Sequence, residues 1–418
     1  MSRDPLAKYL AGRAITSPWS IEGCRDVASA GCIVIPALGE SQRLFATLGS
    51  LTENPPEQLA RFLVVVVVNH REDAAEAEKQ DNRETLRRLR LGEIPLRLAL
   101  VDAASDGLEL PAKTGGVGLA RRIGMDLALP LIAPDGIMVC LDADTLVGPD
   151  YLQAISAHFE TSSAGGAVIP FCHQRGETPA EERAITLYEL FLRHYVLGLT
   201  RAGSPYAFHC VGSAMACTAA AYLKMGGMNG RSAGEDFYFL QQLKRTSGIA
   251  QVGGTVVRPS ARSSHRVPFG TGKSISRILE QGEESQSFYR TDCFRILGEW
   301  LGLVEKGAAL SGGELLAASA GVDPELAAYL EQAGFAQVWE RLRANAGAPE
   351  RLKTAFHGWF DALKTVRLIH HLSLSYPRCR ADQSLPELLR FCGAPHAQGE
   401  LAQLQLLRGM QGGHIVID

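Results

Sequence analysis

Apolar residues in the first half of the chain form short continuous runs, separated by stretches in which apolar and polar positions alternate with helical spacing. The clearest run is FLVVVVV at 62–68, whose β-branched, continuous pattern predicts a strand buried on both faces of a parallel sheet. Further strands are expected at 32–36, 96–101 and 136–141, and helices at 40–51, 81–91, 115–129 and 181–200. Strands that alternate with helices predict an α/β domain with a mainly parallel sheet.

The pattern changes after the segment PFGTG at 268–272. From there the chain is rich in Leu, Ala, Glu and Arg with helical spacing, and it has few β-branched runs. A length of 418 residues favours two to three domains, at about 150 residues per domain. We therefore expect two: an α/β domain at 1–272 and a helical C-terminal domain or appendage at 273–418.

Composition and charge narrow the class of protein. The net charge of −3 argues against a nucleic-acid partner, because phosphate binding calls for a basic surface. The longest strongly apolar run is far shorter than the roughly 20 residues of a transmembrane helix. The N-terminus carries charges and a proline where a signal peptide would be apolar. Nine scattered cysteines without a CxxC pair favour a reduced, cytoplasmic compartment.

Polar residues follow each of the four predicted strands. These segments are PALGE at 36–40, NHRED at 69–73, DAASD at 102–106 and DADT at 142–145. Ligands of open α/β sheets bind beyond the carboxyl ends of the strands, so the four segments are expected to meet there. Any one of them could be ordinary loop polarity, but four together favour a binding site.

Asp142 and Asp144 follow the predicted strand at 136–141 directly. Two carboxylates at positions i and i+2 can point toward one bound cation. Such hard oxygen ligands suit Mg²⁺ or Mn²⁺, which in turn bridge the oxygens of a diphosphate. The DxD spacing also arises by chance in loops, and its position after a buried strand is what makes it informative.

A second acidic pair, Glu235 and Asp236, lies in the first turn of a predicted helix. Phe237, Leu240 and Leu243 give that helix an apolar face, and the glycine-rich segment GGMNG at 226–230 precedes it. Carboxylates in a first turn commonly complement the helix dipole. The functional alternative is that one of them is a general base, which deprotonates an acceptor hydroxyl.

Taken in order, several of these segments resemble a family 2 glycosyltransferase with a GT-A fold. They are IVIPA at 33–37, GLAR at 118–121, LDAD at 141–144, GSAM at 212–215, GG at 226–227 and GED at 234–236. The resemblance covers residues 30–272. It implies a three-layer α/β sandwich that binds a nucleotide-sugar donor, with a UDP-sugar as the expected donor, and the helical C-terminal segment lies outside it.

For the donor, the resemblance implies that Pro36, Ala37 and Glu40 line the nucleotide base and ribose. Asn69 stands where the family commonly has an aspartate facing the base, and Gly39 stands where an asparagine is usual. These two departures leave the nucleobase open. The remaining residues implied on the donor side are Gly118, Arg121, Asp142 and Arg266.

For the chemistry, the resemblance implies that Asp144 binds a Mn²⁺ or Mg²⁺ ion with Asp142 beside it, and that Asp236 is the base of an inverting transfer. Glu235 would be the neighbour of that base. His265 is the candidate third metal ligand, and Arg266 with Lys273 could neutralise the leaving diphosphate. The alternatives are a structural histidine and solvated loop charges.

Other interpretations receive less support from the sequence. FGTGKS at 269–274 ends like a P-loop, but Val267 stands where that motif needs glycine, and Arg121 occupies a position where a Rossmann fingerprint needs glycine. The expected function is therefore a metal-dependent, inverting glycosyltransferase. Alternatives are a retaining transferase on the same fold, a sugar-1-phosphate nucleotidyltransferase and a non-catalytic sugar-nucleotide-binding protein. The acceptor and the oligomeric state stay open.

Overall fold

A computed structural model describes residues 4–231, 233–264 and 270–412 of the chain. Backbone contacts group the chain into two compact units. The first comprises Met1–Glu182, Cys210–Ser276 and Gln411–Asp418, and the second comprises Arg183–His209 and Arg277–Met410. The second unit thus includes an internal segment, 183–209, that the sequence pattern assigned to the α/β part. The domain division at 272 stays a prediction.

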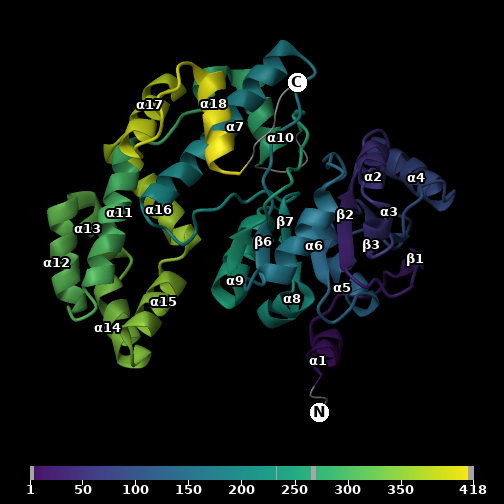
Figure 1. Cartoon of the computed structure of the whole chain (residues 1–418), viewed down its shortest axis with the longest axis horizontal. Helices are drawn as coiled ribbons and strands as arrows, with labels where there is room; N and C mark the ends of the chain where they lie inside the picture. Colours follow the sequence, from purple (N-terminus) through teal and green to yellow (C-terminus); the bar gives the residue numbers. More distant parts are fainter. Residues whose placement is uncertain (1–3, 232, 265–269, 413–418) are drawn as a thin grey trace. The chain divides into compact units, whose positions relative to one another are not determined.

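The first unit is built on a mixed β-sheet, of which Figure 1 labels β1, β2, β3, β6 and β7. This sheet has eight strands in the order β1-β4-β3-β2-β5-β7-β6-β8. Four of the seven strand pairings are parallel: β2 with β3, β3 with β4, β2 with β5 and β6 with β8. The strands are β1 (Ile21–Gly23), β2 (Gly31–Ala37), β3 (Phe62–Asn69), β4 (Leu98–Ala103), β5 (Ile137–Cys140), β6 (Gly166–Val168), β7 (Met215–Thr218) and β8 (Ile249–Gln251).

The central strands form where the sequence has continuous apolar runs. Every residue of β2 and β3 is buried, as expected for a parallel sheet covered on both faces. The helix α5 (Val117–Ala128) packs on both of these strands, and Gly124 lets it approach closely because a Cβ there would lie 2.5 Å from Cγ1 of Val34. The predicted α/β class with a mainly parallel central sheet is confirmed.

Further helices complete the first unit. They are α1 (Pro5–Gly12), α2 (Leu44–Thr52), α3 (Pro56–Leu59), α4 (Glu76–Arg90), the short 3₁₀ helix η1 (Leu129–Leu131), α6 (Tyr151–Thr161), α8 (Ala219–Met225) and α9 (Glu235–Ser247). Sequence patterning located the long central strands but gave no signal for the three-residue strands β1, β6 and β8. Segments this short have too few positions for a period of two to be visible.

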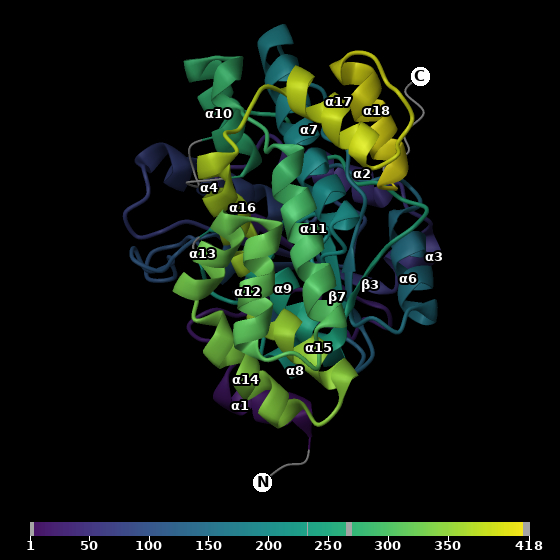
Figure 2. The same ribbon diagram turned by 90° about the vertical axis from the view of Figure 1, so that its left-hand side faces the viewer.

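The second unit is helical, as predicted for the C-terminal part (Figure 2). Its aromatic core includes Trp300, Phe335, Trp339 and Phe356, each at most 1% exposed. Its elements, with α7 and α10 each beginning within the first unit's ranges, are α7 (Pro179–Arg201), α10 (Thr271–Gln281), the short 3₁₀ helix η2 (Glu283–Ser285), α11 (Thr291–Lys306), α12 (Gly312–Val322), α13 (Pro324–Gln332), α14 (Phe335–Ala346), α15 (Pro349–Trp359), α16 (Ala362–Ser375), α17 (Ala381–Phe391) and α18 (Glu400–Met410). Within the described ranges, no helix combines the length and apolar character needed to cross a bilayer.

Candidate functional site

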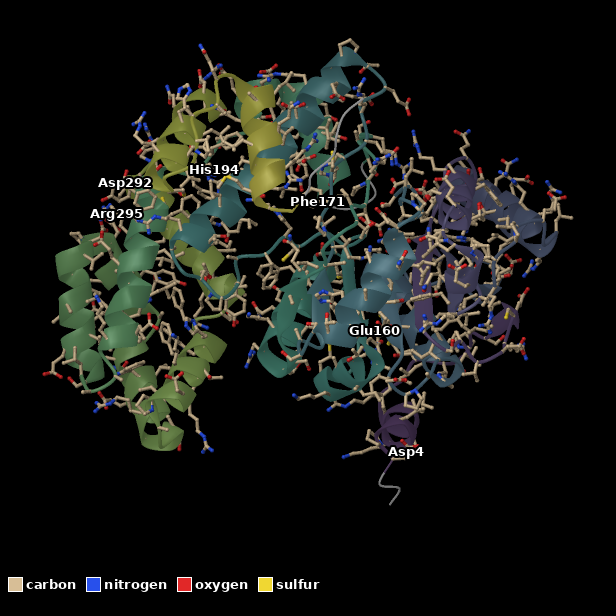
Figure 3. All side chains as sticks on the ribbon, viewed as in Figure 1. Asp4, Glu160, Phe171, His194, Asp292 and Arg295 are labelled. Atoms are coloured by element: carbon tan, nitrogen blue, oxygen red, sulfur yellow. The ribbon has the colours of Figure 1, made fainter. Side chains whose placement is uncertain are left out.

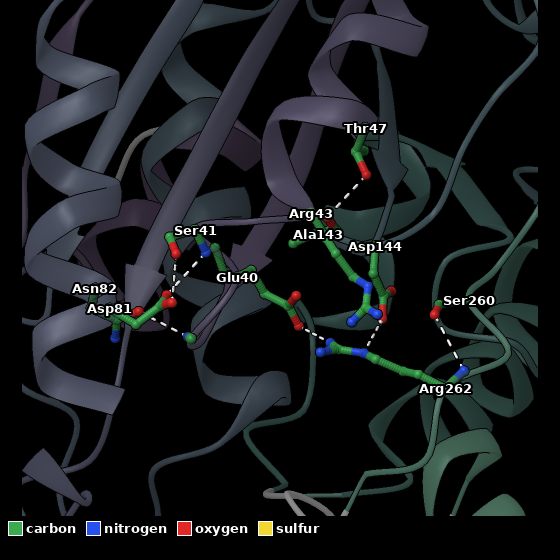
Figure 4. A network of polar contacts seen from close by, with 12 residues as sticks. Glu40, Ser41, Arg43, Thr47, Asp81, Asn82, Ala143, Asp144, Ser260 and Arg262 are labelled. Atoms are coloured by element: carbon green, nitrogen blue, oxygen red, sulfur yellow. Dashed lines mark hydrogen bonds and ion pairs between the residues drawn. The ribbon is translucent and has the colours of Figure 1, made fainter. Parts of the chain in front are cut away.

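The loop that follows β5 carries Asp142 and Asp144, and it is held from two sides. The Thr47 hydroxyl on α2 donates to the carbonyl of Ala143 at 2.9 Å (Figure 4). The Gln174 side-chain amide donates to the carbonyl of Asp144, also at 2.9 Å. Backbone carbonyls in this turn therefore have fixed partners, and the two aspartate side chains project from a rigid loop at the carboxyl edge of the sheet.

One of these side chains, Asp144, shares a guanidinium group with Glu40. Arg262 Nε donates to Asp144 Oδ2 at 3.0 Å, and Arg262 Nη2 donates to Glu40 Oε1 (Figure 4). Burial and the neighbouring Glu40 carboxylate raise the pKa of Asp144 to about 6, although Arg262 opposes the shift. Three segments distant in sequence thus meet here, following β2, β5 and β8.

The loop after β2, which carries Glu40, is anchored by two residues of α4. Asn82 Oδ1 accepts from the backbone N–H of Gly39 at 2.9 Å, and Asp81 accepts from both the N–H and the hydroxyl of Ser41 (Figure 4). Gly39 takes a left-handed conformation with φ 61°, which favours glycine at this position. Asp81 and Asn82 could not be identified as loop anchors from the sequence, because two polar residues on a charged helix give no sign of facing a loop.

Asn69, at the end of β3, stabilises the region around the loop after β2 through its side-chain amide and its backbone carbonyl. Its side-chain amide donates to the backbone carbonyls of Ala37 at 3.2 Å and of Val67 at 3.0 Å, while its backbone carbonyl accepts from the side-chain amide of Asn82 at 2.9 Å. An aspartate could not make the two donor contacts, because an ionised carboxylate only accepts. Asn69 therefore has a structural task in this chain that fits its departure from the family pattern.

A second arginine, Arg121 on α5, lies at the centre of the other acidic group. Its guanidinium pairs with Asp142 through Nη2 and with Glu235 through Nη1. The Arg121 and Glu235 side chains are 2% and 4% exposed, so this is a buried ion pair. Gly212 makes room for it, because a Cβ there would lie 2.6 Å from Arg121 Nη2.

The acidic pair at the start of α9 is held close to α5. Gly118 permits this approach, since a Cβ there would lie 2.3 Å from the Arg231 carbonyl oxygen and 2.8 Å from Glu235 Cβ. Burial raises the pKa of Glu235 to about 7, against the opposing effect of Arg121. Burial likewise raises the pKa of Asp236, whose Oδ1 accepts from the N–H of Phe237 at 2.7 Å.

The sequence-predicted residues thus form two ion-paired groups in the first unit. Glu40 and Asp144 meet at Arg262, whereas Asp142 and Glu235 meet at Arg121, with Asp236 adjacent to Glu235 in the chain. Pro36 and Ala37 are the last residues of β2, next to the loop that carries Glu40. His265 and Arg266 lie outside the described residues. Arg262 was missed, since a single arginine in a loop has no distinguishing pattern.

Whether the site can hold the divalent ion that the family resemblance implies depends on the ligand atoms that its side chains supply. Glu40 and Asp144 supply the hard carboxylate oxygens that Mg²⁺ and Mn²⁺ prefer, and they already surround one cation, the guanidinium of Arg262. Asp142 is instead engaged by Arg121. In the described part of the chain, no three His, Cys, Asp or Glu side chains gather as a ready metal site. The residues fit a cation held by the Glu40–Asp144 pair.

Residues 137–277 match the model of the family described as glycosyl transferase family group 2. The matched segment begins with β5 and includes both acidic pairs and Arg262. Over this segment, which is about a third of the chain, the resemblance to a family 2 glycosyltransferase is confirmed. A comparison with curated proteins gives no match.

Solved structures similar to this chain include the following three. TarS 1-349 from S. aureus, in complex with UDP-GlcNAc, is 13% identical, with 63% of this chain and 70% of that chain covered and a TM-score of 0.39. Mannosyltransferase PcManGT from Pyrobaculum calidifontis, in complex with GDP-Man and Mn²⁺, is 15% identical, with 86% and 95% covered and a TM-score of 0.37. Glucosyl-3-phosphoglycerate synthase from Mycobacterium tuberculosis, in complex with UDP, is 16% identical, with 66% and 80% covered and a TM-score of 0.35.

Proposed function

We propose that this chain is a family 2 glycosyltransferase that depends on a divalent metal ion and moves a sugar from a UDP-sugar to an acceptor hydroxyl with inversion at the anomeric carbon. The observation that carries the proposal is the arrangement of two acidic pairs in one unit, one following β5 and one opening α9, inside the matched family segment. A metal-and-donor position and a proton acceptor are the two groups that such a transfer requires.

The donor would be held by the loop after β2 and by the end of β3. The backbone of this loop is already fixed by Asn82 and Asp81, so the loop needs little further ordering when the donor binds. Preorganised polar groups of this kind cost little reorganisation when the substrate binds. Asn69, held against the carbonyls of Ala37 and Val67, would set one wall of the nucleobase pocket.

Asp236 would take the proton from the acceptor hydroxyl. Its pKa is raised by burial, which increases its affinity for a proton relative to an exposed aspartate. Glu235 is tied to Arg121 and is therefore better placed to hold the start of α9 than to accept a proton. When bound, the divalent ion would neutralise the charge that develops on the departing nucleoside diphosphate.

The test compares two substitutions that separate chemistry from donor binding. Asp236→Asn should nearly abolish transfer and leave Mn²⁺-dependent UDP binding at the wild-type level, whereas Asp144→Asn should weaken both. Asp135→Asn, at an exposed position, is the matched control and should change neither. Wild-type transfer rates in both Asp236→Asn and Asp144→Asn would refute the site assignment.

Product analysis separates the proposed reaction from the other reactions on this fold. The anomeric configuration of the product, read by NMR, distinguishes inversion from retention. Release of pyrophosphate from a nucleoside triphosphate would instead identify a nucleotidyltransferase. Tight nucleotide binding without transfer or donor hydrolysis, against a screen of UDP-, GDP- and TDP-sugars, would identify a binding protein.

We also propose a cytoplasmic location. The nine cysteines are all free thiols, which fits a reducing compartment. Cell fractionation with a marker of each compartment tests this proposal.

A further inference from the structure

The guanidinium of Arg262 occupies the position between two carboxylates that arrive from separate loops. Glu40 follows β2, Asp144 follows β5, and Arg262 lies in the segment after β8 (Figure 4). The side chains of Arg262, Glu40 and Asp144 are 19%, 7% and 20% exposed, so the three groups are largely shielded from water. The positive charge of Arg262 therefore lies between two carboxylates whose oxygen atoms are suitable ligands for Mg²⁺ or Mn²⁺.

In the other acidic group, the arginine is harder to displace from its carboxylates. Asp142 and Glu235 are joined through Arg121, which is 2% exposed and is enclosed by Gly212 on one side. Arg262 is more accessible and belongs to a loop segment and not to a helix that packs on the sheet. If one of the two arginines leaves its carboxylates when a ligand binds, the cost of moving it is lower for Arg262.

We propose that Arg262 is the resident cation of the Glu40–Asp144 pair and that a divalent metal ion binds there only by displacing it. A carboxylate oxygen that coordinates a metal at roughly 2.1 Å cannot keep a guanidinium on the same lone pairs, and the two cations repel each other. The displaced guanidinium then becomes free to bind the diphosphate of the donor, for which its planar fork of donors is suited. This last step rests on the proposed function.

The exchange predicts a specific coupling between metal and nucleotide. Metal alone has to break the Arg262 contacts without compensation, so it binds weakly. Metal together with a nucleoside diphosphate gives Arg262 a new anionic partner, so the two ligands bind cooperatively. Without Arg262, metal binding should no longer depend on the nucleotide to the same degree.

The test measures metal and nucleotide binding directly, without any transfer assay. Mn²⁺ is titrated into the full-length protein in the absence of nucleotide, and free Mn²⁺ is followed by electron paramagnetic resonance. Arg262→Gln is expected to bind Mn²⁺ about tenfold more tightly than the wild type, because breaking charge-assisted hydrogen bonds no longer opposes the metal. UDP is then titrated by calorimetry at saturating Mn²⁺, where Arg262→Gln is expected to bind about tenfold more weakly.

A matched variant controls for the loss of positive charge. Arg258→Gln removes an exposed arginine four residues earlier on the same segment and should leave both affinities at the wild-type level. Arg262→Lys keeps the charge but loses the fork geometry, and its Mn²⁺ affinity should lie between those of the wild type and Arg262→Gln. If Arg262→Gln does not fold by circular dichroism, Arg262→Lys decides alone.

Each outcome bears on the displacement separately from the proposed transfer. An Mn²⁺ affinity that is unchanged or weaker in Arg262→Gln, or in Arg262→Lys where that variant decides, overturns the displacement even if the wild type transfers sugar. Tighter Mn²⁺ binding supports the displacement even if the wild type neither binds UDP nor transfers, a result that would refute the proposed function and the diphosphate step alone.

Discussion

Replacing Arg121 with glutamine should destabilise the first unit strongly. Arg121 is the counterion of Glu235, and both side chains are almost completely buried. Glutamine has a similar length and can still donate a hydrogen bond, but it leaves the Glu235 carboxylate buried without a positive partner. The substitution therefore isolates the charge of Arg121 from most of its volume.

The expected cost follows from the burial of the pair. At pH 9, where Glu235 is ionised beside Arg121 because its pKa there is about 7, removing Arg121 should cost about 3 kcal/mol, since the remaining carboxylate stays desolvated or has to take up a proton. Asp142, whose side chain is 36% exposed, contributes less since water can solvate it. With a denaturant slope of about 2–3 kcal/mol per molar urea, this loss corresponds to a decrease of about 1–2 M in the unfolding midpoint.

The assay has to report on the first unit alone. Cys32, Cys140 and Cys217 are fully buried in its sheet, so their thiols become reactive only when this unit unfolds. Pulse labelling of these thiols across a urea series, followed by peptide mass spectrometry, gives the midpoint of the first unit. Circular dichroism without urea verifies that Arg121→Gln is folded at the start.

Two further variants decide whether the reasoning is correct. Arg87→Gln breaks an exposed pair with Glu84 on α4 and should leave the midpoint unchanged, because surface pairs contribute little. The double variant Arg121→Gln with Glu235→Gln should recover more than half of the loss, since no unpaired buried charge remains there. A midpoint for Arg121→Gln equal to that of Arg87→Gln would refute the argument.

Two other predictions concern packing and pH. Gly118→Ala should destabilise the first unit by about 1–3 kcal/mol, because its methyl group would overlap the Arg231 carbonyl and Glu235 Cβ; Gly49→Ala on α2, with open space around it, should be neutral or stabilising in the same thiol assay. His194, labelled in Figure 3, lies on α7. Its side chain is fully buried, and burial lowers its pKa from 6.5 to about 3. Its neutral form is the folded one, so the stability of the second unit is complete above pH 6.5 and is lost as the pH falls toward 3. Between pH 7.5 and pH 5 the loss is about 2 kcal/mol, measured by urea unfolding with tryptophan fluorescence. A pH dependence of equal size in His194→Gln would contradict this assignment.

The sequence by itself determined the central strands and the helical character of the C-terminal part. β3 could be predicted within one residue because seven consecutive apolar residues fit only a strand buried on both faces. The helix α4 begins at Glu76, five residues before the predicted start at 81, because Ala77 is the only apolar residue of its first turn and gives no amphipathic pattern. Local side-chain chemistry therefore affected where an element begins or ends more than whether the element forms.

The candidate site was partly visible in the sequence for a topological reason. Parallel strands bring their carboxyl ends to one edge, so the segments after β2 and β5 were expected at the same edge. The structure makes them neighbours, because β2 pairs with β5. Sheet topology thus placed Glu40 near Asp144 without any knowledge of the loops. It could not determine how each carboxylate is satisfied, because the partners come from elements with no periodic relation to the strands.

Only the tertiary structure decided which cation each carboxylate meets. Arg121 had been recognised as a donor-side residue, and the structure shows it buried between Asp142 and Glu235. Arg262 gave no signal, because a loop arginine becomes informative only when two carboxylates enclose it. Apolar periodicity is a local property that a sequence displays directly, whereas the pairing of buried charges is a property of three-dimensional proximity between distant segments.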